Sequence, residues 1–230
     1  LAQRLYEEGN ITYHRTDSLN LSEDSLTSAK KFISEKYGQN YWAGKLMKYK
    51  TKSNSAQEAH EAIRPSYPDR SPELLKGIDS RQLKLYTLIW QRFIACQMAP
   101  AVLDSVSVDI KAKNYTFRAN GQTLKFDGFI KIYPTKFEET ELPGIEKNDN
   151  LNLLKLSNVQ HFTEPPARYT EASLIKTLEK FGIGRPSTYA PTLATIQDRN
   201  YVGKNEQKRF VPTEMGAIVN DVLAKHFPEI

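Results

Sequence analysis

Residues 80–110 read SRQLKLYTLIWQRFIACQMAPAVLDSVSVDI, and the hydrophobic period changes within this stretch. Large apolar side chains first recur at helical spacing, and we expect Ser80 to cap a helix over residues 81–98 that Pro100 ends. Beyond Pro100 apolar and polar residues alternate, as they do in a half-buried strand. The stretch therefore predicts an α+β chain in which a helical region leads into a β region. The predicted apolar face of the helix contains Leu85, Leu88, Ile89, Trp90 and Phe93.

The predicted β region is antiparallel and extends over residues 101–163. Asn120-Gly121 lies between two strand-like runs, Tyr115–Arg118 and Thr123–Phe126, and this dipeptide is typical of a two-residue hairpin turn. We expect the strand pattern to continue in two further stretches, residues 129–133 and 151–156.

Residues 1–100 are predicted to form a helical domain. Ser22 is a good N-cap for a helix over residues 23–37, and Gly38 is a typical helix stop. The chain begins inside an amphipathic helix that Gly9 ends, so we expect it to be a piece of a longer protein.

Two further features of this helical domain precede its long helix. Residues 45–54 are polar and rich in lysine, which predicts a loop. Ser55 and Glu58 have the spacing of a capping box, which predicts a short helix through Ile63 that ends before Pro65.

Residues 164–230 return to helical spacing and are predicted to form a third domain. The expected order is helix, short turn, helix, β-ribbon, helix, the outline of a winged helix-turn-helix. The expected elements are a helix over 171–181 capped by Thr170, a helix from Pro186 to about Arg199, strands at 201–202 and 209–211, and a helix from Thr213 to about His226.

The composition narrows the class of protein. Of 230 residues, 32 are Lys or Arg and 27 are Asp or Glu, and the resulting charge of +5 weakly favours a polyanionic partner. A single cysteine excludes an intramolecular disulfide framework and a cysteine-rich zinc site. The longest apolar runs are far shorter than a membrane span.

Residues 10–18, NITYHRTDS, form the first candidate functional segment. If the segment is extended, Tyr13, Arg15 and Asp17 lie on one side of it. A guanidinium beside a tyrosine favours the phenolate and can bind a phosphoryl oxygen, which suits transfer of a phosphodiester onto Tyr13. A surface strand with an Arg15–Asp17 ion pair explains the same pattern.

Two other segments are candidate functional elements, and each has two interpretations. His60 is either a surface histidine or a proton carrier near neutral pH. Residues 182–189 join two helices. Arg185, Ser187 and Thr188 could bind a phosphate at a helix N-terminus, or Ser187 or Thr188 could simply cap that helix. Arg199 lies late in the same helix and could also face a phosphate backbone.

Three motifs resemble those of bacterial type IA DNA topoisomerase I, in the family's order and with similar intervening lengths: ITYHRTDS (11–18), QEAHEAIRP (57–65) and GIGRPSTY (182–189). Three motifs in register are far more specific than one. Further segments are also similar, so the resemblance covers essentially the whole chain. These segments are residues 88–98, 126–129, 165–168 and 171–174.

The resemblance implies a role for each candidate residue. Tyr13 is the expected nucleophile, Arg15 contacts the scissile phosphate, and His60 lies near the active site with Asp17 associated with it. His14 stands where the family has an apolar residue; alternation turns it away from Tyr13, so we assign it no role. The residues expected to bind the DNA strand are Arg185, Ser187, Thr188, Arg199 and Arg168.

The resemblance also implies the architecture and the reaction. It implies a helical gate domain that carries the tyrosine, a β arch segment and a catabolite-activator-like domain. The whole enzyme is expected to cleave single-stranded or negatively supercoiled DNA through a 5′-phosphotyrosine, pass a strand, reseal the break and relax negative supercoils without ATP. It is expected to act as a monomer in the bacterial cytoplasm, associated with the nucleoid and not with a membrane.

Magnesium is the cofactor that the resemblance implies. The family holds it with an Asp-x-Asp-x-Glu pattern, and no Asp-x-Asp occurs in this sequence. We therefore expect no metal ligands among these residues, and we expect the isolated chain to be inactive.

Two other functions fit parts of the sequence. A non-catalytic winged-helix DNA-binding protein with an accessory β domain explains residues 101–230 but leaves the tyrosine and histidine motifs unexplained. Another type IA enzyme, topoisomerase III or reverse gyrase, would share all three motifs.

Overall fold

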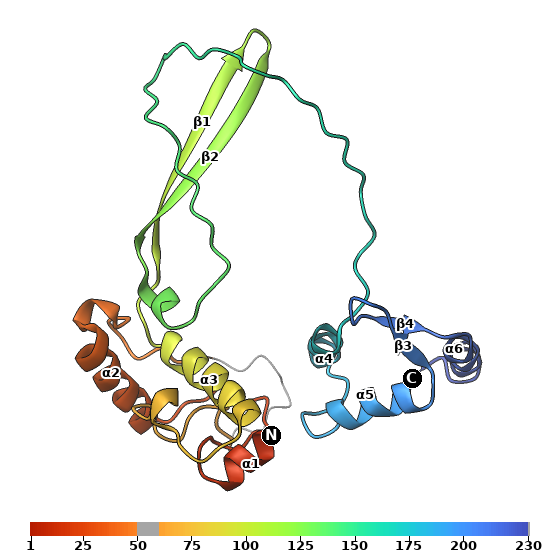
Figure 1. Ribbon diagram of the computed structural model, residues 1–230. Helices are drawn as coiled ribbons and strands as arrows, with labels where there is room; N and C mark the ends of the chain where they lie inside the picture. The colour runs from red at the N-terminus through yellow and green to blue at the C-terminus, as the bar shows by residue number, and fades with distance from the viewer. Residues whose placement is uncertain (50–59, 230) are drawn as a thin grey trace. The chain divides into compact units, whose positions relative to one another are not determined.

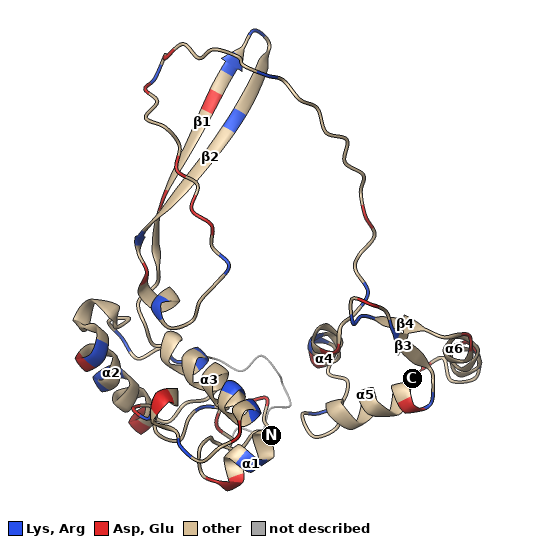
Figure 2. Cartoon of the chain, viewed as in Figure 1, with Lys and Arg blue, Asp and Glu red and all other residues tan. Residues whose placement is uncertain are grey.

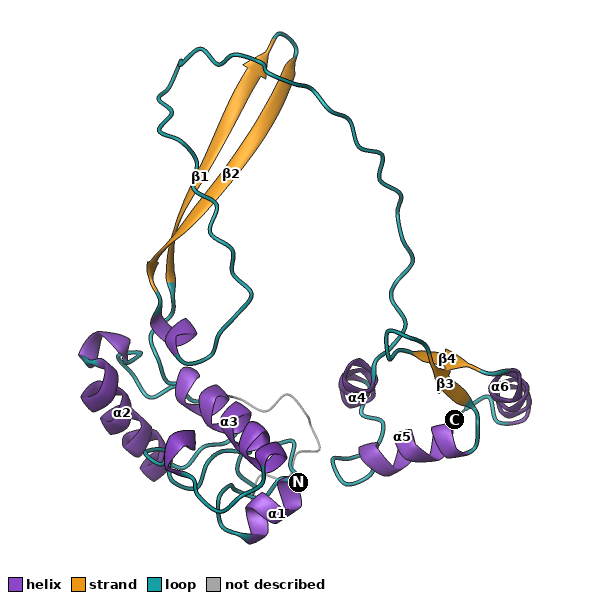
Figure 3. Cartoon of the chain, in the orientation of Figure 1, coloured by secondary structure: helices purple, strands orange, loops and turns teal. Residues whose placement is uncertain are grey.

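The computed structural model describes residues 1–49 and 60–229 (Figure 1). By their contacts the described residues divide into two compact units, residues 1–49 with 60–156, and residues 157–229. Both units contain helices and antiparallel strands, so the predicted α+β class is confirmed (Figure 3). The three-domain division at residues 100 and 163 stays a prediction.

The first unit begins with local signals that the sequence contains. The Ser22 side chain accepts the Ser25 N–H, and Gly38, with φ 102°, ends the helix that follows, so the predicted helix over 23–37 is confirmed. The helices of this unit are α1 (Ala2–Glu7), α2 (Glu23–Tyr37) and α3 (Ser80–Ala95), with short 3-10 helices at Gln39–Tyr41, Pro72–Leu74 and Gly128–Lys131.

Asp79, not Ser80, caps α3. The Asp79 carboxylate accepts the backbone N–H groups of Arg81 and Gln82, and the Gln82 side chain accepts the Asp79 N–H in return. The carboxylate completes a capping box that the Ser80 hydroxyl, one residue later, cannot form. The helix ends at Ala95, three residues before the predicted end.

The core of the first unit is built on α3. Leu88 of the predicted apolar face is 50% exposed, and the buried residues of α3 are Gln82, Tyr86, Trp90, Phe93, Ile94 and Ala95. The Trp90 indole N–H donates to the Pro68 carbonyl at 2.8 Å, and burial raises the pKa of Tyr86 to about 12. The side chains that pack with α3 in this core include Leu5, Ile11, Ala29, Ile33, Leu75, Met98 and Ile132.

A long antiparallel hairpin follows, formed by β1 (Val102–Ala112) and β2 (Tyr115–Phe126). The predicted turn at Asn120-Gly121 is wrong: Ala112 pairs with Tyr115, so the turn is at Lys113-Asn114, where Lys113 has φ 55°. Gly121 instead pairs with Val106 in mid-strand.

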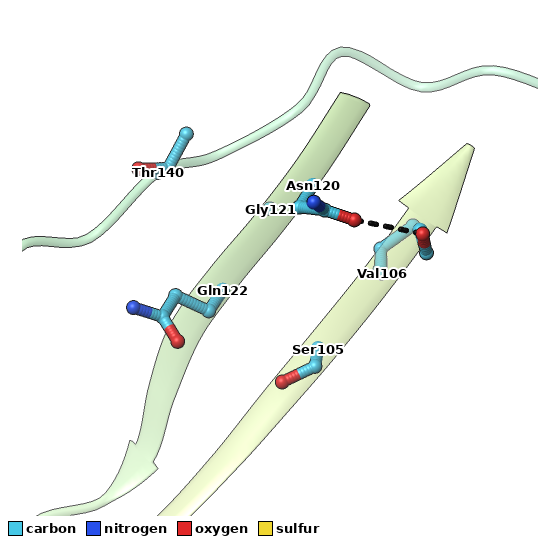
Figure 4. A pocket seen from close by; sticks show the side chains of 7 residues that line it. Ser105, Val106, Asn120, Gly121, Gln122 and Thr140 are labelled. Carbon is cyan, nitrogen blue, oxygen red and sulfur yellow. Dashed lines mark hydrogen bonds between the residues drawn. The ribbon is translucent and has the colours of Figure 1, made fainter. Parts of the chain in front are cut away.

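A close backbone approach explains the glycine at position 121. Gln122 and Thr140 exchange backbone hydrogen bonds of 2.8 and 3.0 Å, and Figure 4 shows Thr140 beside β2 on the side away from β1. A Cβ on Gly121 would lie 2.8 Å from both the Thr140 carbonyl oxygen and the Leu142 side chain. The lack of a side chain at Gly121 therefore lets residues 140–142 pack against β2, and Asn120-Gly121 does not form a turn.

Two other predicted strands do not form. Residues 128–131 form a 3-10 helix in place of the strand expected over 129–133. Residues 151–156 have no regular structure, and Leu154 is 96% exposed. The alternating apolar side chains there do not pack against another segment of the described chain.

The predicted segments around residues 45–63 lie partly outside the described residues. Residues 45–49 are irregular, as the predicted loop requires, and residues 50–59 are not described. Residues 60–63 are not helical, so the predicted end of that short helix is wrong. The Ala62 N–H donates to the Asn20 carbonyl at 2.8 Å, and this long-range hydrogen bond takes the place of one within a helix.

The second unit follows the predicted order of elements. Thr170 forms a capping box with Ser173, and the Thr213 hydroxyl accepts the Gly216 N–H, so both predicted caps are confirmed. The second helix begins at Tyr189, three residues after Pro186. The elements are α4 (Glu171–Lys180), α5 (Tyr189–Asp198), β3 (Val202–Lys204), β4 (Phe210–Pro212) and α6 (Glu214–His226), and β3 pairs with β4.

Charge is unevenly distributed over the helices of the first unit. All three charged residues of α3, Arg81, Lys84 and Arg92, are basic, whereas α2 carries both signs (Figure 2). No helix in the described part of the chain is both long enough and apolar enough to cross a membrane.

Gly216 is expected to be essential for the packing of α6. Its replacement by alanine would place a Cβ over the Tyr201 carbonyl, which also accepts the Thr213 N–H at 3.0 Å. We expect Gly216→Ala to destabilise the second unit by about 1–3 kcal/mol, because overpacking outweighs the helix propensity gained.

Hydrogen exchange of the α6 amides should show this loss of stability as faster exchange. Gly203→Ala is the matched control, since a Cβ there meets no atom within 4 Å. Equal exchange rates for the two variants would contradict the proposed contact.

Candidate active site

Tyr13 lies two residues beyond a buried anchor. Gly9, with φ 70°, turns the chain at the end of α1, and Ile11 is 2% exposed in the core. Ile11 also pairs with Pro65 in an isolated antiparallel bridge. The anchor fixes where the chain leaves the core, and the Tyr13 side chain that follows is 39% exposed.

Thr12 joins the tyrosine segment to residues 62–64. Its N–H donates to the Arg64 carbonyl at 2.9 Å, and its hydroxyl donates to the Ala62 carbonyl at 2.7 Å. The same hydroxyl accepts the Arg64 N–H at 2.9 Å. Three hydrogen bonds therefore hold the residue immediately before Tyr13, and sequence patterns gave no indication of this role.

The Tyr13 ring packs in a cluster of aromatic side chains. Its centroid lies 5.2 Å from that of Tyr6 and 5.7 Å from that of His60, both in edge-on geometry. The structure thus brings His60, far along the sequence, next to Tyr13. Aromatic packing of this kind restricts the ring while the exposed part of the side chain faces solvent.

Tyr13 separates two surface hollows. The first also contains Arg15 and His14, and the second also contains His60 and Glu61. Tyr13 therefore lies between a hollow that Arg15 lines and a hollow that His60 lines.

The tyrosine segment is bent and not a continuous strand. Ile11 is the one residue of the described segment 10–18 that forms a β-bridge, and the chain bends at Thr12 and at His14–Arg15. The expectation that His14 points away from Tyr13 is therefore wrong, since the two ring centroids are 5.6 Å apart.

His14 is held as a neutral imidazole. Its Nδ1 atom is buried without a hydrogen-bond partner among the described residues. Burial, with the positive charges of Arg15 and the N-terminus, lowers the pKa of His14, and Glu7 opposes this shift. At neutral pH the side chain adds aromatic surface beside Tyr13 and little charge.

The other two candidates of this segment are less constrained. Arg15 is exposed, and its guanidinium donates to the Gln3 side chain at 3.5 Å. Asp17 is half-buried, and no hydrogen bond or ion pair joins it to Arg15 or His60 in the described structure. The structure therefore groups Tyr13 with His60 and Arg15 but does not pair Asp17 with either.

Glu61 and Arg64 form an ion pair behind His60. Arg64 Nη2 lies 2.7 Å from Glu61 Oε2, and Glu61 Oε1 accepts the Ser22 N–H at 2.7 Å. Burial raises the pKa of Glu61, but the hydrogen bonds from Arg64 and Ser22 outweigh it and hold this pKa below its usual value. Sequence patterns gave no indication of the bond from Glu61 to Ser22, which lies 39 positions away.

The turn before α5 contains three of the predicted DNA-binding residues. The Thr188 hydroxyl accepts the Arg185 N–H at 2.8 Å, so it closes the turn and does not cap α5. Gly184, with φ 79°, allows this turn. Arg185, Ser187 and Thr188 are all exposed.

The remaining two predicted DNA-binding residues lie elsewhere in the second unit. Arg199 is exposed at the C-terminal end of α5, about 15 Å along the helix from its start. Arg168 is exposed before α4, and its carbonyl accepts the Arg209 guanidinium at 2.8 Å. Arg185 and Arg199 are thus at opposite ends of α5 and cannot bind the same phosphate.

The comparisons agree with the motifs. A family model described as DNA topoisomerase matches residues 1–230. The structure of full-length topoisomerase I from Thermotoga maritima is similar, with a TM-score of 0.78 and 34% sequence identity over 96% of this chain. The chain belongs to the bacterial type IA DNA topoisomerase family. It spans 36% of the Thermotoga maritima chain.

Type IA topoisomerases use Mg²⁺. Residues 1–49 and 60–229 contain no group of three or more His, Cys, Asp or Glu side chains that could hold a metal ion. Glu61, the carboxylate in the hollow beside Tyr13, is already bound to Arg64 and Ser22.

Thr12→Val is expected to loosen the tyrosine segment. The variant keeps the shape of the side chain but leaves the Ala62 carbonyl and the Arg64 N–H without their partner. We expect a loss of about 1–3 kcal/mol in the stability of the first unit.

Urea unfolding followed by tryptophan fluorescence measures this effect, since Trp42 and Trp90 both lie in the first unit. Thr12→Ser keeps the hydroxyl and should remain within about 1 kcal/mol of the unmodified chain. A valine variant as stable as the serine variant would show that these bonds contribute little.

Proposed function

We propose that this chain carries the nucleophile of a type IA DNA topoisomerase, and that the nucleophile is Tyr13. The whole enzyme would cleave one DNA strand, pass a strand through the break, reseal it and relax negative supercoils without ATP. The observation that carries the proposal is the position of Tyr13, partly exposed between a hollow with Arg15 and a hollow with His60.

The proposed reaction is a transesterification. The Tyr13 oxygen attacks the phosphorus of a single-stranded phosphodiester, and the bond from phosphorus to the 3′ oxygen breaks. The phenol loses its proton, and the departing oxygen gains one to become a 3′ hydroxyl. The 5′-phosphotyrosine replaces one phosphodiester, so resealing reverses the step and needs no ATP.

The neighbours of Tyr13 suit this reaction. Arg15 is exposed and can turn its guanidinium to two oxygens of the scissile phosphate, which stabilises the charge of the transition state. His60 lies against the Tyr13 ring, and an imidazole can both donate and accept a proton, so His60 can supply a proton to the departing oxygen. Asp17 is assigned a supporting acidic role on the resemblance of residues 11–18 to the family's motif alone.

The second unit is proposed to bind the strand. It has the helix, helix, ribbon, helix order of a winged helix-turn-helix, and its exposed basic and hydroxyl groups can contact successive phosphates. The residues assigned to these contacts are Arg185, Ser187, Thr188, Arg199 and Arg168.

Magnesium, the partners and the location follow from the same proposal. We place the magnesium ligands in residues of the enzyme outside this chain and expect the chain alone not to relax supercoiled DNA. The substrate is single-stranded or negatively supercoiled DNA, and the enzyme acts as a monomer at the bacterial nucleoid in the cytoplasm. The family match over residues 1–230 does not favour a non-catalytic winged-helix protein or a paralogue.

Tyr13→Phe in the full-length enzyme is expected to abolish the covalent DNA adduct. The change removes only the phenolic oxygen and keeps the packing against Tyr6 and His60, so noncovalent strand binding should stay within about twofold. A denaturing gel with a labelled oligonucleotide detects the adduct.

Tyr6→Phe is the matched control, since it removes a hydroxyl from the ring that packs on Tyr13. It should still form the adduct. Relaxation of supercoiled DNA by the Tyr13 variant would show that another residue is the nucleophile.

Arg185→Ala is expected to weaken single-strand binding regardless of sequence. Loss of one phosphate contact should reduce the slope of log K against log salt by about 0.7. Arg185→Lys keeps the charge and should keep the slope. Titrations at several salt concentrations measure it, and an unchanged slope in the alanine variant would show that Arg185 only closes the turn with Thr188.

A further inference from the structure

The Arg64 side chain is only 11% exposed, and hydrogen-bond acceptors surround its guanidinium. Nη2 donates to Glu61 Oε2 at 2.7 Å, and Nη1 donates to the Pro65 carbonyl at 3.0 Å. Weaker contacts complete the set: Nε to Glu61 Oε1 at 3.4 Å, Nη2 to the Ser22 hydroxyl at 3.3 Å and Nη1 to the Ser66 carbonyl at 3.5 Å. The side chain is therefore held in one position.

The Glu61–Arg64 pair joins two other parts of the first unit. Through its backbone, Arg64 binds Thr12, the residue before Tyr13. Through Glu61, the pair binds the N–H of Ser22, the residue that caps α2. The Glu61 and Arg64 side chains thus hold the start of α2, and the main chain of Arg64 holds the tyrosine segment.

His60 depends on this arrangement for its position. Among the described residues the His60 imidazole has no hydrogen-bond partner, and its ring packs edge-on against the ring of Tyr13. Glu61, the next residue, is held at both carboxylate oxygens. The Glu61 contacts therefore determine where the chain places the histidine.

Net stability alone is a poor explanation for such a pair. A partly buried ion pair often contributes little compared with apolar side chains of the same size, because both charges lose water. What the pair does supply is a fixed geometry with several directional bonds.

We propose that Glu61 and Arg64 are positioning residues that hold His60 against Tyr13 and keep both aligned with the start of α2. The proposal rests on the proposed role of Tyr13 as the nucleophile. Neither side chain touches the reacting atoms in this assignment; both fix the main chain at residues 61 and 64, which places His60 and bonds to Thr12. If they act in this way, their loss should slow the chemical step more than it weakens strand binding.

The test separates these two quantities in the full-length enzyme. The rate of adduct formation is measured under single turnover with saturating enzyme, and the dissociation constant of the same oligonucleotide is measured in a Tyr13→Phe background. The variants are Arg64→Ala, Arg64→Lys and Glu61→Gln. Arg81→Ala is the control, because it removes an exposed positive charge of the same unit that takes no part in these contacts.

We expect Arg64→Ala to slow adduct formation at least tenfold while the dissociation constant changes less than twofold. Arg64→Lys keeps the charge but not the fork of donors, so it should slow the step about threefold. Glu61→Gln keeps the shape and the acceptor for Ser22 but loses the charge, and should slow the step by threefold to tenfold. The Arg81 variant should match the unmodified enzyme.

Rates within twofold of the unmodified enzyme for Arg64→Ala and Glu61→Gln would overturn the proposal. A parallel loss of binding and cleavage that follows the unfolded fraction would also overturn it, since that is a purely structural role. If Arg64→Ala does not fold, Glu61→Gln and Arg64→Lys decide by the same criteria. An adduct formed by the enzyme whose single change is Tyr13→Phe would instead contradict the nucleophile assignment.

Discussion

Pairing between residues 10–12 and 62–66 is the constraint on which the rest of the first unit depends. The Ile11–Pro65 bridge buries Ile11 in the core, and the Thr12 hydroxyl bonds to both Ala62 and Arg64. Residues 60 and 61 directly precede this paired segment, so the pairing also places His60 against Tyr13 and Glu61 beside Ser22, the cap of α2. Core packing, helix start and candidate active site therefore share one set of contacts.

The elements predicted best are those whose signals are local. Ser22, Thr170 and Thr213 each bond to a backbone N–H three residues later, so the sequence next to each helix contains its cap. The predictions at Asn120-Gly121 and at residues 60–63 were wrong because distant segments decide those conformations. Thr140 lies against Gly121, and Asn20 and Thr12 take the backbone bonds of Ala62.

The candidate site shows the same division. Motif resemblance predicted that Tyr13 and His60 belong to one site, and their ring centroids lie 5.7 Å apart. Periodicity predicted a strand that would have turned His14 away, but its ring centroid lies 5.6 Å from that of Tyr13. Thr12, Glu61 and Arg64 lie within two of the motifs, but the motifs do not show what these residues bond to, because their partners depend on which segments the fold brings together. A threonine or an ion pair becomes informative only when its partners are known.

The separation of the paired segments has a consequence for the order of folding. Thr12 and Ala62 are 50 positions apart, and their contact closes a long loop at an entropic cost that local helices do not have. Helix α2 can nucleate from its own cap as soon as it is synthesised, but the tyrosine segment reaches its final geometry only after residues 60–66 have left the ribosome. The Tyr13 side chain is thus set in place late, by a piece of chain made well after it.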